Sequence, residues 1–441
     1  MRMSHCDHQD LDDEGQVTLG SSPTHAHQDH WVQAFTAVEE CGHWLGEGGT
    51  VLLRAMHDDT SIWFEVAGTE KAPGGAVAGG AGEVAAGPCV SPAPPMPKGD
   101  RPALFELLDA ERLAVLNDAA RNAALARRVR SAVARAAGGG GLVVHLGDGP
   151  LLPLLLAHTV ADSAADSATD SAADGTVANG GPGADDDAMR PGGHVRIVSF
   201  ASDEASLELS ARFLGANRLL SWVHVTTCEP GLELPPRSVS LVTAEPYFQP
   251  EHYARQWGGS ALLRYWLSCH ALTPYLADGA VFAPSVARLM GAVVECGALW
   301  RARQPCGAAV EGLDLCELNS LHSYARVEAV PIWRHAHKLL TRPAELLRLA
   351  FDTPPNRPAE SEVSLLALAS GTGHALLLWL EYHDGEDGPM WATTAPDEHG
   401  CSPQLQGIRY FSTPRVTREG EAWVCRASVN APEGLLTAGV T

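Results

Sequence analysis

The sequence predicts an α/β domain with a doubly wound parallel sheet, followed by a β-sandwich or barrel-like domain. Between residues 140 and 284, short apolar runs alternate with segments of helical periodicity, which is typical of a parallel sheet covered by helices. Farther along, the segments become rich in β-forming residues, and the clearest of these are 286–300, 361–370, 374–383, 407–413 and 421–430.

Apolar periodicity places the individual elements of the first part. Strands are expected near 142–147, 195–200, 223–227, 239–244 and 280–284, and helices near 150–161, 203–216 and 258–276. A leucine pattern predicts a further helix over 103–137. Upstream, 29–66 is expected to form three strands, at 31–38, 49–57 and 61–66, with a turn at Asp58 and Asp59.

Three segments lack an apolar pattern. The polar residues 1–25 are expected to be disordered, and 67–100, rich in Ala, Gly and Pro, is expected to be a flexible linker. An acidic tract of Ala, Ser and Asp at 162–194 is expected to be a surface loop. It connects a helix to the next parallel strand, opposite the ligand-facing loops, so it should leave any pocket unaffected.

Composition excludes several classes of protein. A formal charge of −22 argues against a nucleic-acid surface, although it suits a basic protein partner. The ten cysteines include no C-x-x-C pair, so we expect reduced thiols and a cytoplasmic or nuclear location. The first residues lack the apolar core of a signal peptide, and no apolar run is long enough for a membrane span. We therefore expect a soluble protein.

The turn after the first strand of the sheet is the place where such folds bind a nucleotide or S-adenosyl ligand. Here it contains Gly147, Asp148 and Gly149, and Pro150 follows where a third glycine would be expected. Proline has no backbone N–H to donate. The turn therefore predicts the fold strongly and the binding of a ligand only weakly. The alternative is a turn with a purely structural role.

Several segments together point to a known family. They are DHWVQAF, GTVLLRAMHDDTSIWFEV, RPALFELLDAERL, LGDGPLL, TAEPYF, GALWRARQPCG, EGLDL, AVPIWR and HALLLWLEYH. In order and number they resemble the protein arginine N-methyltransferase family, in its branch built from two tandem catalytic-type units. The resemblance implies that 26–66 are the last strands of a first unit. It implies a Rossmann-like S-adenosylmethionine-methyltransferase domain over 101–284, with the insertion, and a β-barrel-like domain over 285–441.

The chemistry of this family needs a glycine turn for the cofactor, an acid for the ribose hydroxyls and paired carboxylates for the guanidinium. By resemblance, the cofactor-binding residues would be Gly147, Asp148 and Gly149. His145 stands where the family usually has an acid, and Ser199 or Phe200 replaces the acid at the end of the second strand. Two acids follow there, Asp203 and Glu204, and we expect them to cap the next helix.

The substrate carboxylates are also incomplete. Glu245 matches the first glutamate of the family's pair, and Glu251 is a weak candidate for the second. The second glutamate is expected slightly farther along the loop, where this chain has Ala254 and Arg255. A cation at Arg255 would repel a substrate guanidinium. A structural loop is therefore the alternative to an arginine site.

By resemblance, His30 and Trp31 match a His-Trp pair that forms one wall of the arginine pocket, but they belong to the first unit. In the second unit the matching stretch has Pro403 and Gln404. We expect no metal site, because only Cys89 lies near the place of a zinc site attributed to the family. The histidines near the start match no zinc spacing.

These observations leave three hypotheses open. The chain is a pseudo-enzyme that keeps the methyltransferase fold as a scaffold, an active enzyme with unorthodox ligands, or a fragment of a larger enzyme. In the second case, Asp148 or Asp203 would contact the ribose, and Glu245 with Glu251 would hold the arginine. The first and third are compatible and preferred. The family resemblance implies a parent that monomethylates protein arginines with S-adenosylmethionine, and a supporting unit that pairs with a catalytic one, as a pseudo-dimer or homodimer.

Overall fold

The computed structural model describes residues 50–57, 62–70, 115–136, 141–173, 197–227, 234–245, 257–306, 312–321, 326–355, 358–396 and 405–440. For 50–57, 62–70 and 163–173, the description covers the backbone. The chain divides into two compact units, Met1–Pro94 and Pro95–Thr441.

In the first unit, β1 (Thr50–His57) and β2 (Ile62–Glu70) form an antiparallel hairpin. The strands expected at 49–57 and 61–66 are confirmed, with a β-bulge between Leu52 and Leu53. The second strand runs four residues beyond its expected end, to Glu70, so residues 67–70, expected to belong to the linker, form part of the strand. Residues 71–100 lie outside the described residues. The strand expected at 31–38 and the segment 1–25 lie outside the described residues.

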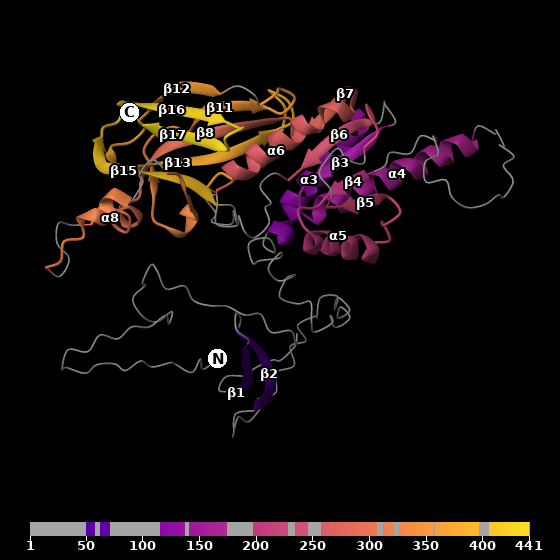
Figure 1. Ribbon diagram of the computed structural model, residues 1–441, viewed down its shortest axis with the longest axis horizontal. Coiled ribbons are helices and arrows are strands. Elements are labelled where there is room, and N and C mark those ends of the chain that lie inside the picture. Colours follow the sequence, from indigo (N-terminus) through magenta and orange to yellow (C-terminus); the bar gives the residue numbers. More distant parts are fainter. Residues whose placement is uncertain are drawn as a thin grey trace, which may run out of the picture. The chain divides into compact units, whose positions relative to one another are not determined.

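The second unit contains a five-stranded sheet in which every neighbouring pair is parallel. Figure 1 shows its strands gathered at the right of the view. Its order is β5-β4-β3-β6-β7, so the chain reverses direction across the sheet between β3 and β6. Ligands of such sheets bind at this switch point, outside the carboxyl ends of the strands. The strands are β3 (Leu142–Leu146), β4 (Ile197–Phe200), β5 (Val223–Thr226), β6 (Val239–Ala244) and β7 (Leu276–Ala283).

All five strands expected from the sequence are present. The predicted Rossmann-like fold class is therefore confirmed by the order and the parallel pairing. The last strand starts earlier than expected, because Leu276 already pairs with Val239 of β6. Both faces of the central strands are covered, and β6 is buried along its whole length, which explains its mainly apolar sequence, with Ser240 and Thr243 as buried polar exceptions.

The helices of this sheet are α3 (Ala119–Ala136), α4 (Leu151–Ala173), α5 (Glu204–Ala216) and α6 (Gly259–Ala271), with a 3-10 turn η3 (Thr273–Tyr275) after the last. Helix α3 packs on α4, β6 and β7 through an apolar face that includes Leu125 and Val129. The helix expected over 103–137 is thus confirmed in its second part, and 103–114 lie outside the described residues.

The helix expected at 150–161 is longer than predicted. Helix α4 runs to Ala173, so the first part of the tract expected to be a loop at 162–194 is helical (Figure 1). The physical reason is that the tract begins ADSAADSATDSAA, and alanine, the best helix former, outweighs the weaker propensities of serine and aspartate. Residues 174–194 lie outside the described residues.

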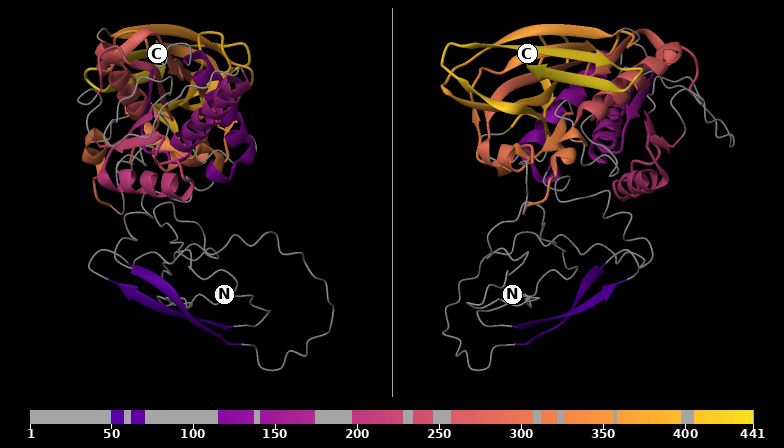
Figure 2. Two further views of the ribbon diagram at one scale, coloured as in Figure 1. Left: turned by 90° about the vertical axis from the view of Figure 1, so that its right-hand side faces the viewer. Right: turned by 60° about the vertical axis from the view of Figure 1, so that its left-hand side comes forward.

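The second half of this unit is built from antiparallel strands, as expected for a barrel-like domain (Figure 2). A seven-stranded sheet has the path β10-β8-β13-β15-β9, with β11 on β8 and β14 on β13; a three-stranded sheet has the order β12-β16-β17. The strands are β8 (Val286–Glu295), β9 (Glu328–Val330), β10 (Lys338–Leu339), β11 (Ala344–Ala350), β12 (Ala359–Leu366), β13 (Gly371–His383), β14 (Met390–Thr393), β15 (Gln406–Thr417), β16 (Ala422–Asn430) and β17 (Leu435–Val440).

One expected strand ends early. Residues 286–300 were predicted as one β-segment, but β8 stops at Glu295 and a short helix α7 (Gly297–Arg301) follows. The turn brings the indole Nε1 of Trp300 within 2.8 Å of the carbonyl oxygen of Phe411, to which it donates. Two further short helical segments, α8 (Cys316–Leu321) and η4 (Ile332–Arg334), lie in the same half.

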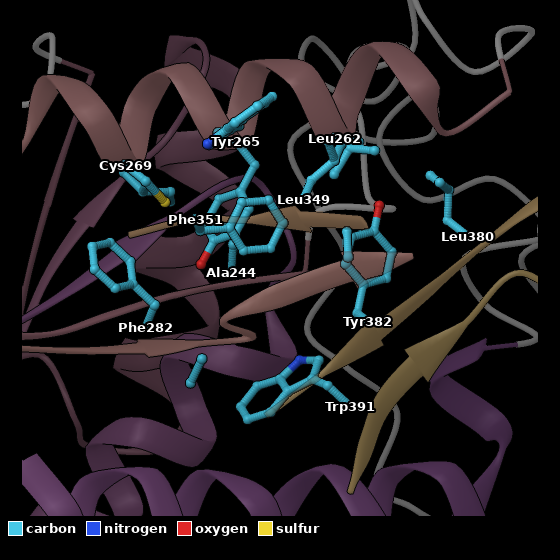
Figure 3. Close-up of a cluster of buried hydrophobic side chains, with 14 of the residues drawn as sticks. Ala244, Leu262, Tyr265, Cys269, Phe282, Leu349, Phe351, Leu380, Tyr382 and Trp391 are labelled. Atoms are coloured by element: carbon cyan, nitrogen blue, oxygen red, sulfur yellow. The ribbon is translucent and has the colours of Figure 1, made fainter. Parts of the chain in front are cut away.

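The parallel sheet and the antiparallel half share one hydrophobic core. Figure 3 shows Leu262 and Tyr265 of α6 beside Phe351 and Tyr382 of the antiparallel half, with Trp391 of β14 below them. The rings of Tyr265 and Phe351 meet edge to face, with centroids 4.6 Å apart. This shared core fixes the antiparallel half over the sheet. None of the described helices is both long and apolar enough to cross a lipid bilayer.

Candidate functional site at the carboxyl edge of the parallel sheet

The turn between β3 and α4 holds the three residues expected to bind the cofactor. Gly147 has a φ of 129°, which only glycine adopts readily, so its identity is dictated by the backbone of the turn. Its N–H donates to the carbonyl oxygen of Phe200 at 3.1 Å. Asp148 is 3% exposed, and its Oδ1 accepts from the backbone N–H of Ser202 at 2.7 Å. Two groups of the turn that could contact a ligand, the N–H of Gly147 and the carboxylate of Asp148, are therefore bonded to residues at or just after the end of β4. Gly149 lies in the same turn.

The acid after β4 is also engaged. Asp203 is the N-cap of α5, and its Oδ1 accepts from the backbone N–H of Ser206 at 2.7 Å. The expectation that Asp203 caps the next helix is therefore confirmed, and Glu204 lies in the first turn of α5, as expected. Both acids that could accept hydrogen bonds from a ribose, Asp148 and Asp203, already accept from backbone N–H groups.

A buried histidine takes the place expected for an acid on β3. His145 is fully buried, and its Nδ1 lies 2.8 Å from Oγ of Ser199, its register partner on β4. Among the described residues, the other ring nitrogen, Nε2, has no hydrogen-bond partner. Burial lowers the pKa of His145 from 6.5 to about 3, so the ring is neutral at physiological pH. His145 is a core residue of the sheet rather than a solvent-facing base.

Glu245 directly follows β6, at the carboxyl edge of the sheet. Its side chain is 1% exposed, and its Oε1 lies 2.5 Å from Nη2 of Arg121 in the first turn of α3. Arg121 is placed there by the start of the helix, where Oδ1 of Asp118 accepts from the Arg121 backbone N–H at 2.9 Å. The candidate substrate carboxylate Glu245 is therefore paired with a guanidinium from the same chain.

The other expected site residues lie outside the described residues. They are Glu251, Ala254 and Arg255 of the loop after β6, His30 and Trp31 of the first unit, Cys89, and Pro403 with Gln404. Their roles stay predictions. Within the described part of the chain, no group of three or more His, Cys, Asp or Glu side chains is arranged to hold a metal ion.

Known proteins resemble the chain along most of its length. It is 26% identical over 442 residues to protein arginine N-methyltransferase 7 of Cricetulus longicaudatus, an alignment that covers 93% of this chain and 55% of that protein. The same enzyme of Bos taurus is 24% identical over 432 residues, covering 92% of this chain and 53% of that protein. Over most of its length the chain is therefore similar to proteins of the arginine N-methyltransferase family.

The chain spans about half the length of the curated relatives it matches. Another arginine methyltransferase, protein arginine N-methyltransferase 1.6 of Arabidopsis thaliana, is 25% identical over 193 residues, 42% of this chain and 26% of that protein. Among solved structures, the Trypanosoma brucei PRMT1 enzyme-prozyme heterotetrameric complex with AdoHcy has a TM-score of 0.48 and 14% identity, covering 71% of this chain and 86% of that chain. No protein-family model matches the chain.

The resemblance to arginine methyltransferases implies an S-adenosylmethionine cofactor, and the contacts of the turn indicate whether this chain could hold one. The described residues do not fit it. The N–H of Gly147 and the carboxylates of Asp148 and Asp203 are bonded within the chain, and Pro150 has no N–H to offer. A ligand would therefore have to displace these contacts or use the acceptor positions that they leave open.

Sequence reasoning missed the partners of the site residues. Arg121, Ser199 and Ser202 were not expected to contact Glu245, His145 and Asp148. For Arg121, no sequence signal exists, because α3 carries several further arginines, Arg127, Arg128, Arg130 and Arg135, and nothing in the sequence distinguishes Arg121 among them. For Ser202, no sequence signal exists either, because the contact uses only its backbone N–H.

Proposed function

We propose that this chain carries a non-catalytic, supporting unit of a protein arginine methyltransferase. The observation that carries the proposal is the state of the cofactor turn, where Asp148 accepts from Ser202 and Asp203 caps α5. The parent protein would monomethylate protein arginines with S-adenosylmethionine. This chain would contribute structure to that activity.

The contrast between framework and site supports this proposal. The buried strands and the shared core are complete, while the ribose acid is absent and the glycine turn is bonded within the chain. Packing in a core is maintained by its contribution to stability, since core substitutions cost the most. Polar side chains that serve only catalysis or ligand binding contribute little to stability. Stability therefore does not preserve them once the activity is lost.

The hypothesis of an active enzyme with unorthodox ligands requires Asp148 or Asp203 to bind the ribose. One oxygen of each carboxylate already accepts a backbone N–H at 2.7 Å, so a ribose would have to use the other oxygen or displace this contact. Displacing it would cost about 1.5–3 kcal/mol, the usual contribution of a hydrogen bond to a charged group. This cost counts against the hypothesis.

The partner that this proposal implies is a catalytic arginine methyltransferase unit, in the same protein or in another chain. Such a unit would use the present one as a brace for its own substrate-binding helices. We further propose a cytoplasmic or nuclear location, on the basis of the ten scattered cysteines.

A methylation assay tests the proposal. The purified chain, radiolabelled S-adenosylmethionine and an Arg/Gly-rich peptide are expected to give no transfer above the background without protein. Because no chemistry depends on Glu245 in this account, the Glu245→Gln variant is expected to match the wild type. Transfer above background that Glu245→Gln abolishes would contradict the proposal.

A further inference from the structure

A four-residue repeat occupies the second half of helix α4. From Ala161 to Ala172 the chain reads ADSA, ADSA and TDSA, so a serine recurs at every fourth position, at Ser163, Ser167 and Ser171. Positions four apart drift by only about 40° around an α-helix, so the backbone places these three serines on one face. In the sequence, each serine has an aspartate directly before it and another three residues after it. The candidate site makes no use of this repeat.

The repeat lies beyond the part of α4 that packs in the core. Among the described side chains of the helix, the last core residue is Val160, and the side chain of Asp162 is 65% exposed. No apolar residue larger than alanine follows within α4, so the repeat has no apolar face to bury. Figure 1 shows this end of α4 extending beyond the sheet. The helix here therefore depends on the propensity of its alanines, which makes it easy to open.

We propose that Ser163, Ser167 and Ser171 are phosphorylated by an acidophilic Ser/Thr protein kinase, and that phosphorylation unfolds this half of α4. A kinase of this class has a basic substrate groove, which suits a carboxylate three residues after the acceptor serine. The co-substrate is ATP. A bond forms between the serine Oγ and the γ-phosphorus, and the bond from that phosphorus to the β,γ-bridging oxygen breaks. ADP leaves, and the hydroxyl proton passes to the catalytic aspartate of the kinase.

Thr159 is an internal contrast to the three serines. It stands four residues before Ser163 and also has an aspartate, Asp162, three residues after it. Its Oγ1, however, donates to the carbonyl oxygen of Leu155 at 2.7 Å, and it precedes the buried Val160 in the packed part of α4. Because a kinase takes its acceptor from an extended segment, Thr159 would react only after core contacts had broken. The repeat opens without that cost.

Charge explains the expected unfolding. A phosphoserine carries a charge of about −1.5 to −2 at pH 7, and each would stand beside an aspartate and about one turn from the next phosphoserine. Like charges at this spacing destabilise a helix. The repeat also lies toward the carboxyl end of α4, where the helix dipole disfavours negative charge. The cofactor turn adjoins the other end of the helix, at Leu151, so the change should leave the turn unaffected.

Phosphorylation of the purified full chain tests the proposal. The reagents are Mg²⁺-ATP and casein kinase 2, an acidophilic kinase, with a kinase that requires basic residues, the cAMP-dependent protein kinase, as the control. Peptide mass spectrometry should find phosphate on the three serines with the acidophilic kinase only, and none on Thr159. Circular dichroism should show the loss of about a dozen helical residues. The melting temperature should change by less than about 2 °C, because the repeat does not contribute to the core.

Two sets of variants separate recognition from charge. Asp166→Asn/Asp170→Asn removes the carboxylates that follow Ser163 and Ser167, and should lower phosphorylation of these two serines about tenfold or more. Replacing all three serines by aspartate should lower the helical signal without any kinase. Replacing them by asparagine, which has a similar helix propensity but no charge, should leave the helical signal higher than aspartate does.

Absence of phosphate from the three serines would overturn the proposal, as would equal phosphorylation of the Asp166→Asn/Asp170→Asn variant. Phosphorylation that leaves the helical signal unchanged would overturn the conformational step. None of these measurements depends on S-adenosylmethionine or on methyl transfer. The failure of this inference is therefore distinguishable from the failure of the proposed supporting role.

Discussion

Replacing Trp391 with alanine is expected to lower the free energy of unfolding by about 3–5 kcal/mol. Trp391 is 2% exposed and is among the largest side chains in the core that joins the parallel sheet to the antiparallel half (Figure 3). Removal of the indole leaves a cavity in the core that joins β14 to α6, two elements more than a hundred residues apart in the sequence. Chemical unfolding followed by circular dichroism measures the change.

The control is its neighbour on β14, Met390, which is 37% exposed. Met390→Ala is expected to change the free energy of unfolding by less than about 1 kcal/mol, as exposed substitutions usually do. If Trp391→Ala were as mild as Met390→Ala, the two halves would not depend on a common core. The scaffold role would then lose its structural basis.

Acid is expected to destabilise the protein through His145. The folded-state pKa of about 3 lies below the unfolded value of 6.5, so below pH 6.5 the unfolded chain binds a proton that the folded chain does not. The stability contributed by the neutral ring is present above pH 6.5 and is lost as the pH falls toward 3. Between pH 7 and pH 5 this loss amounts to about 2 kcal/mol.

His145→Asn isolates this effect. An asparagine amide can keep a hydrogen bond to Ser199 and does not titrate in this range. The difference in unfolding free energy between wild type and variant should therefore shift by about 2 kcal/mol between pH 7 and pH 5, in favour of the variant at pH 5. A difference that stays constant across this range would mean that His145 is not held neutral in the folded protein.

Much of the parallel sheet could be predicted from sequence. Its central strands are largely buried, so apolar residues dominate them, as in β3 at Leu142–Leu146, where His145 is the one exception. The end of α4 could not be predicted in the same way. The tract after residue 161 has no apolar face, and only the helix propensity of its alanines, a weak signal, continues the helix.

The candidate site was only half predictable. The sequence shows that no acid for the ribose ends the second strand of the sheet, and that Glu245 matches the first glutamate of the family's pair. It does not show what Glu245 and Asp148 contact. The partner of Glu245 is 124 positions away on another element, and the partner of Asp148 is a backbone N–H. Contacts of this kind depend on how helices and strands pack together. No local pattern in the sequence predicts that packing.

The central claim is that the cofactor turn is closed by its own contacts, and calorimetric titration of S-adenosylmethionine into the purified chain tests it most directly. The account predicts no saturable heat, which corresponds to a Kd weaker than about 1 mM. Binding with a Kd of about 10 µM or tighter, lost in Asp148→Ala, would contradict it. It would mean that the contact from Asp148 to Ser202 yields to the ligand.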